Sequence, residues 1–228
     1  MGRLFPELVA PSVPVVGVPE RFPVRRIFCI GRNYADHAKE MGLTVDREDP
    51  TFFTKPADAI VVDSADVPYP SATKNLHHEV EMVVALGSGG TDVPVDEALS
   101  HVVAYGVGLD LTRRDLQARA REKGMPWDTA KAFDASAPIS SLRLVRDVGH
   151  VSACDISLAV DGVVRQKANT AAMIFDVAEI IHLLSGLFEL RAGDLIFTGT
   201  PAGVGPLERG QRFVARLGDI AELHGRMV

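Results

Sequence analysis

Two acidic residues at the start of an apolar run restrict the possible folds of this chain more than any other feature. Glu79 and Glu81 precede the run MVVALG, whose composition is typical of a buried strand. Residues two apart in a strand point to the same face and lie about 7 Å apart along the chain. Two like charges on one half-buried face repel each other and are costly to remove from water, and a bound cation removes that cost. An exposed pair on a solvated strand face is the alternative, and the apolar run argues against it.

A third carboxylate strengthens the prediction of a cation site. Asp110 follows the apolar segment VVAYGVGL and is expected at the rim of the core, where a turn or capping residue is the other interpretation. Three carboxylates form an all-oxygen site that suits Mg²⁺ or Mn²⁺ and leaves positions open for water and a chelating substrate. Zinc is the competitor because His77 and His78 are adjacent, but the sequence lacks H-E-x-x-H and zinc usually takes more nitrogen or sulfur ligands.

The remaining pattern consists of many short strands and few helices. Strands are predicted within 25–31, 50–56, 77–87, 102–110, 193–200 and 211–225, and a hairpin within 153–168. The hairpin turns at Asp161-Gly162, the dipeptide of a type I′ turn. The helices do not alternate regularly with the strands, which disfavours a doubly wound parallel sheet. The predicted fold class is a strand-rich α+β roll or distorted barrel.

Local signals indicate where the predicted helices begin and end. Asn33 can cap a short helix within 33–42, and Gly42 can end it. Thr112 and Asp115 have the spacing of a capping box, and Gly124 is a natural end for that helix. A third helix, within 173–186, is amphipathic. Its apolar face is formed by Val177, Ile180, Ile181 and Leu184. The polar segment 43–50 is predicted to be a mobile surface loop.

The composition restricts the partners and the compartment. A net charge of −6 without a basic stripe argues against nucleic acid and against an anionic membrane surface. Cys29 and Cys154 lie in separate apolar runs and are expected to be buried thiols. Because neither a signal-peptide pattern nor an apolar stretch of about 20 residues is found, the cytoplasm is the expected location. The 228 residues are expected to form a Pro-rich N-terminal arm, 1–25, and one domain, 26–228.

A histidine and a glutamate are the first candidates for proton transfer. His37 and Glu40 are three residues apart in the predicted helix 33–42, so they share a face and can hydrogen-bond. A histidine oriented by a carboxylate is suited to activate water as a general base. The polar loop after this helix would allow it to act as a lid. A surface ion pair is the alternative.

Positive charges are candidates for substrate binding. Arg113 and Arg114 open a predicted helix, where the helix dipole disfavours cations. That placement indicates another purpose, such as binding a substrate carboxylate. Lys55 and Lys131 are further candidates, although an isolated lysine is usually a solvated surface charge.

The segment TGTPAGVG, 198–205, is predicted to be a carboxylate-binding loop that includes Gly199 and Thr200. Glycines allow close backbone approach, and hydroxyl and backbone N–H groups bind a carboxylate. The loop is not G-x-G-x-x-G, and the sequence has no P-loop, so nucleotide binding is unsupported. It also has no G-x-S-x-G elbow, which disfavours a serine hydrolase.

Six runs occur in a specific order: IGRNYADHAKEMG, FFTKP, NLHHEVEMVVALG, AYGVGLDLTRRDLQ, KGMPWDTAKAFDASAPIS and DLIFTGTPAGVGPL. Together they resemble the fumarylacetoacetate hydrolase family over roughly residues 27–228. The resemblance implies a β-rich roll of the family's own type, usually a homodimer, with one divalent metal ion per subunit. It implies metal binding by Glu79, Glu81 and Asp110, a catalytic dyad of His37 and Glu40, and substrate contacts by Arg114, Gln117, Lys131 and Thr200. Lys55 lies in the matching F-x-K-P run.

The most similar members are the small acylpyruvases and fumarylpyruvate hydrolases. The resemblance therefore implies hydrolysis of a carbon–carbon bond in a 3-acylpyruvate, which gives pyruvate and a carboxylic acid. In the implied mechanism His37 takes a proton from water, and Lys131 or Arg114 stabilises the developing oxyanion. Arg113 stands where relatives often carry a small residue, which leaves open which arginine meets the substrate. The short N-terminal segment is unlike the separate domain of the two-domain members, which disfavours fumarylacetoacetate as substrate.

Four alternatives to this reaction are weighed at this stage. The same site would serve decarboxylation or tautomerisation of oxaloacetate, where no attacking water is needed. It would also serve an isomerase or decarboxylase of aromatic-acid breakdown. A non-catalytic metal or dicarboxylate binder is disfavoured because it needs no pair such as His37 and Glu40. A purely structural domain would leave the carboxylates without a purpose.

Overall fold

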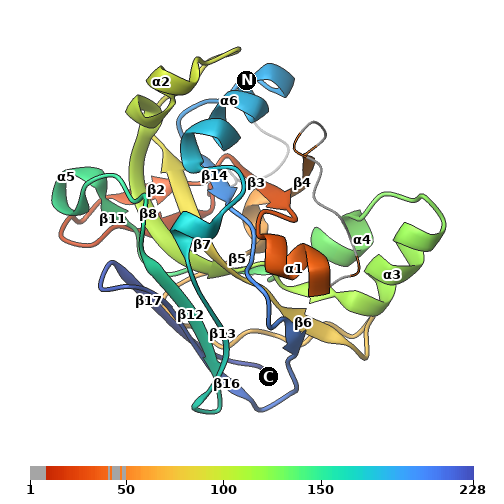
Figure 1. The fold of residues 1–228 in the computed structure, drawn as a ribbon. Coiled ribbons are helices and arrows are strands. Elements are labelled where there is room, and N and C mark those ends of the chain that lie inside the picture. Colours follow the sequence, from red (N-terminus) through yellow and green to blue (C-terminus); the bar gives the residue numbers. More distant parts are fainter. Residues whose placement is uncertain (1–8, 41, 43–46, 48–49) are drawn as a thin grey trace, which may run out of the picture.

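The computed structural model describes residues 9–40, 42, 47 and 50–228, and strands dominate it (Figure 1). The largest sheet has the strand order β11-β8-β7-β14-β3-β4. Its strands are β3 (Arg26–Gly31), β4 (Thr51–Lys55), β7 (Val80–Leu86), β8 (Val102–Leu109), β11 (Arg143–Leu144) and β14 (Asp194–Phe197). Only β14 and β3 pair in parallel, so the sheet is mixed. Over the described part of the chain, the outer strands β11 and β4 do not pair with each other, so the strand-rich α+β fold is confirmed without a closed barrel.

The central strand β7 accounts for the long apolar run. It pairs with β8 on one edge and β14 on the other, and all of its residues are buried. Met82 and Val84 belong to one apolar cluster, whereas Val83 and Ala85 belong to a second cluster. The strand is therefore covered on both faces, which is why its side chains do not alternate between apolar and polar.

A second sheet is fully antiparallel, with the order β13-β12-β16-β17. Its strands are β12 (Asp155–Val160), β13 (Val163–Asn169), β16 (Arg212–Leu217) and β17 (Ala221–Arg226). Asp161 and Gly162 have φ angles of 48° and 80°, the positive values that a type I′ turn requires. The predicted hairpin is confirmed. Ile156 and Leu158 of β12 join the apolar cluster of Met82, so the second sheet packs against the first.

Three small sheets complete the strand structure, with the orders β15-β6-β9, β10-β5 and β1-β2. Their strands are β1 (Ser12–Pro14), β2 (Arg21–Pro23), β5 (Ile60–Val61), β6 (Leu76–His78), β9 (Thr112–Arg113), β10 (Ala137–Pro138) and β15 (Gly205–Pro206). The strand predicted over 77–87 is divided at Glu79, because β6 pairs with β9 and β15 while β7 joins the large sheet. The Asp110 N–H donates to the Glu79 carbonyl at 2.8 Å, so both residues lie where the chain passes from one sheet to the other.

The helices are short, and α1, α3 and α4 lie on the same side of the molecule (Figure 1). They are α1 (Ala35–Glu40), α2 (Val95–Ala98), α3 (Arg114–Glu122), α4 (Asp128–Lys131), α5 (Val145–Val148) and α6 (Val177–Leu187), with 3₁₀ turns η1 (Ala57–Ala59), η2 (Leu99–His101) and η3 (Thr170–Ala172). Helix α6 buries the predicted apolar face. It begins with a capping box between Asp176 and Glu179, which the sequence analysis missed.

Both predicted helix caps are wrong, for the same physical reason. Thr112 lies in β9, and α3 begins only at Arg114 without a side-chain cap. The Asp115 carboxylate accepts a hydrogen bond from the Thr73 hydroxyl instead. Asn33 does not cap α1, because its side chain binds the backbone of two distant loops. In each case a tertiary partner replaces the local one that the sequence pattern indicates.

The N-terminal segment packs on the rest of the chain. Val13 of β1 is fully buried in the second apolar cluster. Arg25 and Arg26 approach the buried carboxylate of Asp194 to 3.1 and 2.8 Å.

Cys29 is buried as predicted, whereas Cys154 is only half-buried. No helix in the described ranges is long and apolar enough to cross a bilayer. The loop predicted at 43–50 lies almost entirely outside the described residues.

Candidate active site

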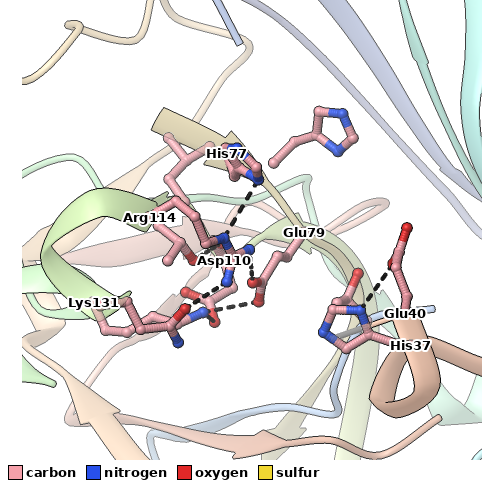
Figure 2. Close-up of polar contacts among 12 residues, drawn as sticks. His37, Glu40, His77, Glu79, Asp110, Arg114 and Lys131 are labelled. Atoms are coloured by element: carbon pink, nitrogen blue, oxygen red, sulfur yellow. Dashed lines mark hydrogen bonds and ion pairs between the residues drawn. The ribbon is translucent and has the colours of Figure 1, made fainter. Parts of the chain in front are cut away.

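Three buried carboxylates form the centre of the candidate site (Figure 2). Glu79, Glu81 and Asp110 each offer an oxygen atom, and these atoms lie within 4.8 Å of one another. The residues are 5%, 1% and 1% exposed. Glu79 comes from the junction of β6 and β7, Glu81 from β7, and Asp110 from the residue after β8. The three residues predicted to hold a metal ion are therefore brought together by two adjacent strands.

Basic side chains surround these carboxylates. Lys131, at the end of α4, places its Nζ 2.8 Å from Glu79 Oε2 and 2.6 Å from Asp110 Oδ2. Arg114, at the start of α3, donates from its guanidinium to Glu79 Oε1. Lys55, at the end of β4, lies 2.8 Å from Asp110 Oδ1. A buried charge is costly unless it is paired, so the two lysines and the arginine make this cluster tolerable inside the protein.

The neighbouring charges shift the pKa values in opposite directions. Burial raises the pKa of Glu81 well above its usual range, and the charges of Asp110 and Glu79 raise it further. Burial would also raise the pKa of Glu79, but Lys131 and Arg114 outweigh that effect and hold it well below its usual range. Burial opposes the charged form of Lys131, yet Asp110 and Glu79 raise its pKa overall. Glu81 is thus the carboxylate whose negative charge is least compensated by the protein.

The donor atoms fit a hard divalent cation. Asp110 Oδ1 has no hydrogen-bond partner among the described residues, because the nearby Lys55 ammonium approaches it without hydrogen-bond geometry. Glu81 uses Oε2 to accept a hydrogen bond of 2.7 Å from the Gly199 N–H. A cluster of three buried carboxylates is the donor set that Mg²⁺ or Mn²⁺ prefers.

The adjacent histidines do not join this cluster. His77 Nε2 contacts Asn75 at 2.9 Å, and burial together with the charge of Arg114 lowers the pKa of His77 to about 4. The His78 Nδ1 atom lies 2.8 Å from the Gln166 side chain. Within the described residues, the carboxylate group contains no histidine or cysteine. The zinc alternative therefore has no support in the geometry.

The histidine of the predicted His37–Glu40 pair lines the same cavity as the carboxylates. His37 is 7% exposed, and its Nδ1 lies 3.4 Å from Glu40 Oε2. The Glu40 carboxylate also accepts from the Gly203 N–H at 3.2 Å, which ties α1 to the Gly-rich loop. Figure 2 shows the His37 ring and Lys131 on different sides of the Glu79 carboxylate. With Nδ1 directed at Glu40, Nε2 is the nitrogen that remains for proton transfer.

The structure distinguishes the two arginines. Arg114 lines the cavity that also holds the carboxylates, and its guanidinium donates to Gln117 as well as to Glu79. Arg113 instead places its guanidinium 4.2 Å from the Phe133 ring centroid and does not line the cavity. Burial also lowers the pKa of Arg113. Arg114 is therefore the arginine positioned to meet a substrate.

Most of the predicted site residues line one cavity, but Glu40, Lys55 and Gly199 do not. The cavity is lined by His37, Glu79, Glu81, Asp110, Arg114, Gln117, Lys131 and Thr200 of the predicted set. Lys55 is fully buried against Asp110 and the backbone carbonyls of Leu111 and Lys131, away from the cavity wall. Gly199 directs its N–H at Glu81. Lys55 and Gly199 contact the carboxylates, and their contact with substrate stays a prediction.

Six cavity residues were missed by the sequence analysis, and four of them carry a charge or an aromatic ring. Arg32 and Arg121 bring positive charge to the wall, and Phe53 and Trp127 form an aromatic side with ring centroids 5.8 Å apart. Arg32 has a φ of 62°, the left-handed region that is rare for residues other than glycine. Arg32 Nε has no hydrogen-bond partner in the described part of the chain. Arg32 and Trp127 lie in the family-like runs IGRNY and KGMPWD. No sequence pattern assigned a role to either residue.

Comparison with known proteins identifies the family. Residues 26–228 match the sequence model of a protein family described as fumarylacetoacetate (FAA) hydrolase, C-terminal. A solved fumarylpyruvate hydrolase from Pseudomonas aeruginosa, in complex with Mn²⁺ and pyruvate, is 50% identical with a TM-score of 0.97, and the match covers 100% of this chain and 99% of that one.

Two curated relatives carry a different activity in their names. The mitochondrial oxaloacetate tautomerase FAHD1 of Mus musculus is 40% identical over 199 residues, which cover 87% of this chain and 90% of the relative. The oxaloacetate tautomerase YcgM of Escherichia coli is 40% identical over 190 residues, which cover 83% and 86%. The extent of these matches leads to one conclusion: the chain belongs to the fumarylacetoacetate hydrolase family.

Proposed function

We propose that this protein is a divalent-metal-dependent hydrolase of 3-acylpyruvates, with fumarylpyruvate as the preferred substrate. The observation that carries the proposal is the placement of His37, which pairs with Glu40, in one cavity with the carboxylates Glu79, Glu81 and Asp110. A cation site alone would serve binding or tautomerisation. A histidine oriented by a carboxylate adds a means of activating water, which hydrolysis requires.

The proposed chemistry uses the residues in separate roles. When bound by the three carboxylates, Mg²⁺ or Mn²⁺ supplies Lewis-acid stabilisation of negative charge on the 2-oxo acid. His37 Nε2 takes a proton from water, and Glu40 stabilises the charged ring through Nδ1–H. The water oxygen bonds to the distal carbonyl carbon, C4. The C3–C4 bond then breaks with its electron pair on C3, which takes up a proton to complete pyruvate, and C4 leaves as a carboxylic acid.

Lys131 and Arg114 are the proposed electrostatic partners of the reacting oxygens. Both hold the Glu79 carboxylate at hydrogen-bond distance, so their positive charges lie at the cavity wall beside the metal site. A positioned donor of this kind typically contributes about 3–4 kcal/mol to the stabilisation of an oxyanion. Gln117 receives a hydrogen bond from Arg114 and thereby holds the guanidinium in place.

The cavity wall favours a substrate with a second carboxylate. Arg32 and Arg121 line it in addition to Arg114, and three cations exceed what one carboxylate needs. Phe53 and Trp127 provide an apolar side for a flat, unsaturated chain. Fumarylpyruvate has both features, and it is the substrate named for the Pseudomonas aeruginosa relative.

Oxaloacetate tautomerisation or decarboxylation is the second candidate function. It is favoured by the names of the mouse and Escherichia coli relatives, which are 40% identical to this chain. Oxaloacetate is also a dicarboxylic 2-oxo acid, so the same arginines suit it. Neither reaction needs attack by water, so the His37–Glu40 pair would be dispensable for decarboxylation.

Three further properties are part of the proposal. We expect Mg²⁺ or Mn²⁺ to support activity, because both suit an all-oxygen site. We expect a homodimer of chains, each formed by the arm 1–25 and the catalytic domain 26–228. The cytoplasm stays the proposed location, although the mouse relative is named as mitochondrial.

Pyruvate release from three substrates tests the proposal. Acetylpyruvate, fumarylpyruvate and oxaloacetate are offered to the Mn²⁺-loaded protein, to His37→Ala and to the control His224→Ala, which changes an exposed histidine of β17. Because positioned proton transfer contributes about 10²–10⁴-fold, His37→Ala should lose at least about 100-fold in acylpyruvate hydrolysis and His224→Ala should lose nothing. Pyruvate from oxaloacetate alone, unchanged in His37→Ala, would transfer the assignment to decarboxylation, and interconversion of the oxaloacetate enol and keto forms without pyruvate would transfer it to tautomerisation.

A further inference from the structure

Gln166 is buried, whereas its neighbours in the sequence of β13 are exposed to solvent. Val163, Val164, Arg165 and Lys167 are exposed, whereas Gln166 is only 1% exposed. Hydrophobicity alone would bury the valines and leave the amide in water. Burying a primary amide is costly unless each of its polar atoms finds a partner. The inward position of Gln166 therefore needs a specific reason.

A β-bulge turns Gln166 inward. Leu158 pairs with Gln166 and Ala159 pairs with Val164, so Arg165 is an extra residue without a partner in β12. Bulges of this kind redirect a side chain and are frequent next to active sites. The bulge also supports the Gly-rich loop. A Cβ atom on Gly203 would lie 2.2 Å from the Arg165 carbonyl oxygen, so only glycine lets the loop pack this closely.

The amide of Gln166 has partners on both sides. Its Oε1 accepts from the Val80 N–H at 3.1 Å and contacts His78 Nδ1 at 2.8 Å. Its Nε2 donates to Thr200 Oγ1 and to the Pro201 carbonyl, both at 2.8 Å. A backbone N–H can only donate and a carbonyl can only accept, so Val80 and Pro201 together determine the orientation of the amide. His78 must then carry its proton on Nδ1.

This orientation determines which hydrogen-bonding role remains for Thr200. Because Oγ1 of Thr200 accepts from Gln166, its own hydrogen is left for another acceptor. The residue is 2% exposed and lines the cavity with Glu81 and His37, and its hydroxyl donates to no residue in the described part of the chain. The acceptor available at that wall is a bound ligand.

We infer that Gln166 is a positioning residue that turns the Thr200 hydroxyl into an obligatory hydrogen-bond donor for the carboxylate of a bound 2-oxo acid. The same side chain satisfies the Val80 N–H beside Glu79, so it joins the start of β7 to the Gly-rich loop across the site. The inference rests on the proposed function only in assuming that a 2-oxo acid occupies this cavity.

Oxalate binding to the Mn²⁺-loaded protein tests the inference without turnover. Oxalate is a flat dianion that resembles the 2-oxo carboxylate, and its Kd is measured by calorimetry. Gln166→Met removes all four hydrogen bonds at similar length, and Gln166→Glu keeps the acceptor toward Val80 but loses the donor toward Thr200. Thr200→Val removes the hydroxyl, Thr200→Ser retains it, and Lys167→Met is the matched control on the exposed face of β13.

When a hydrogen-bond donor that faces a charged ligand is removed, binding of that ligand weakens by about tenfold or more. We expect this rise in the oxalate Kd for both Gln166 variants and for Thr200→Val, and a change below about twofold for Thr200→Ser and Lys167→Met. The Mn²⁺ affinity of Gln166→Met and Thr200→Val should stay within about twofold, because neither residue is a carboxylate of the cluster. In the double variant Gln166→Met/Thr200→Val, the losses should be far less than multiplicative, since Gln166 acts on the ligand only through the Thr200 hydroxyl.

Two results would overturn the inference. Either the oxalate Kd of both Gln166 variants stays within about twofold of the native value, or the losses in the double variant multiply. A purely structural role for Gln166 would lower the unfolding temperature of the metal-free protein and leave the coupling with Thr200 absent. If Gln166→Met does not fold, the oxalate Kd values of Gln166→Glu and of the double variant Gln166→Glu/Thr200→Val are compared instead, and the same two results would overturn the inference. Failure of the native protein to release pyruvate from any substrate overturns the proposed function instead, because oxalate binding does not depend on turnover.

Discussion

At the scale of single residues, the candidate site is a balance of buried charges. The Glu79 and Asp110 carboxylates share the Lys131 ammonium, and Lys55 also lies against Asp110. Among the described residues, Glu81 receives a hydrogen bond only from the Gly199 N–H. Burial and the like charges of Asp110 and Glu79 raise its pKa. A site with one under-compensated carboxylate gains most from a divalent cation, because the ion removes the repulsion.

The first prediction concerns Glu81→Gln. The neutral amide keeps an oxygen for the Gly199 N–H but removes a charge that repels Asp110 and Glu79. We expect the metal-free variant to be at least as stable as the native protein toward urea. Mn²⁺ at 100 times its native Kd should stabilise the native protein by about 2.7 kcal/mol and the variant by less than about 1 kcal/mol. Glu222→Gln, at the exposed β17, is the control, and equal Mn²⁺ stabilisation of all three proteins would contradict a metal role for Glu81.

The second prediction concerns the substrate preference set by Arg32. If its guanidinium meets the second carboxylate, Arg32→Leu should lower kcat/KM for fumarylpyruvate about tenfold or more beyond the loss for acetylpyruvate, which lacks that group. The ratio of the two substrates is an internal control for damage to the fold. Arg32→Lys should retain part of the preference, because it keeps the charge without the planar fork. An equal loss for both substrates would remove Arg32 from the proposed carboxylate site.

At the scale of elements, the site depends on loops that only glycine permits. Gly199 has a φ of 90°, and a Cβ atom there would lie 2.6 Å from the Cβ of Asn33. Asn33 cannot move away easily, because its amide binds the Phe175 and Thr198 backbones at 2.7–2.9 Å. The loop and the turn before α1 are therefore locked together, with the Gly199 N–H directed at Glu81.

The third prediction separates backbone strain from this close contact. Gly210 has a similar φ of 86°, but a Cβ atom there would meet nothing within 4 Å. Gly210→Ala should therefore cost only the strain of a left-handed residue, about 1 kcal/mol. Gly199→Ala should cost that strain plus overpacking, about 2–4 kcal/mol in total, and should also weaken Mn²⁺ binding. Urea unfolding measures both costs, and equal costs would show that the Asn33 contact relaxes freely.

At the scale of the whole molecule, the fold holds the site between two sheets. The chain leaves the three-stranded sheet and enters the six-stranded sheet at Glu79, and Asp110 marks the corresponding junction on the neighbouring strand. Helices α1, α3 and α4 surround this junction and contribute His37, Arg114 and Lys131 (Figure 1). The backbone therefore changes direction where the chemistry is concentrated, and the central strand β7 behind it is fully buried.

The fourth prediction concerns assembly. The described part of the chain exposes large apolar side chains, among them Met125, Val164, Leu187 and Phe188. Together with the family's usual dimer, this leads us to expect twice the chain mass of 24.5 kDa in sedimentation equilibrium. Only the mass of a single chain, at all concentrations tested, would contradict the homodimer.

Much of the fold was predictable from short-range patterns. The buried run after Glu81, the type I′ turn at Asp161-Gly162 and the apolar face of α6 follow from periodicity and turn chemistry, which depend on neighbouring residues. The candidate carboxylates were also visible, because charges beside a buried strand are unusual. Errors arose where a distant partner outcompetes a local one. Thr112 joins a strand and Asn33 binds two loops, so neither residue caps a helix.

Hydrophobic periodicity and charge are properties of the chain, so the strand-rich class and the three central carboxylates could be predicted from the sequence. The arrangement of the site, including its arginine and aromatic wall, depends on tertiary contacts. The tertiary structure brought Arg114 rather than Arg113 to the cavity and left Lys55 behind Asp110. It also turned Gln166 inward, although its neighbours predict an exposed strand. These outcomes depend on contacts between segments that lie far apart in the chain, where burial and hydrogen-bond satisfaction outweigh local propensity.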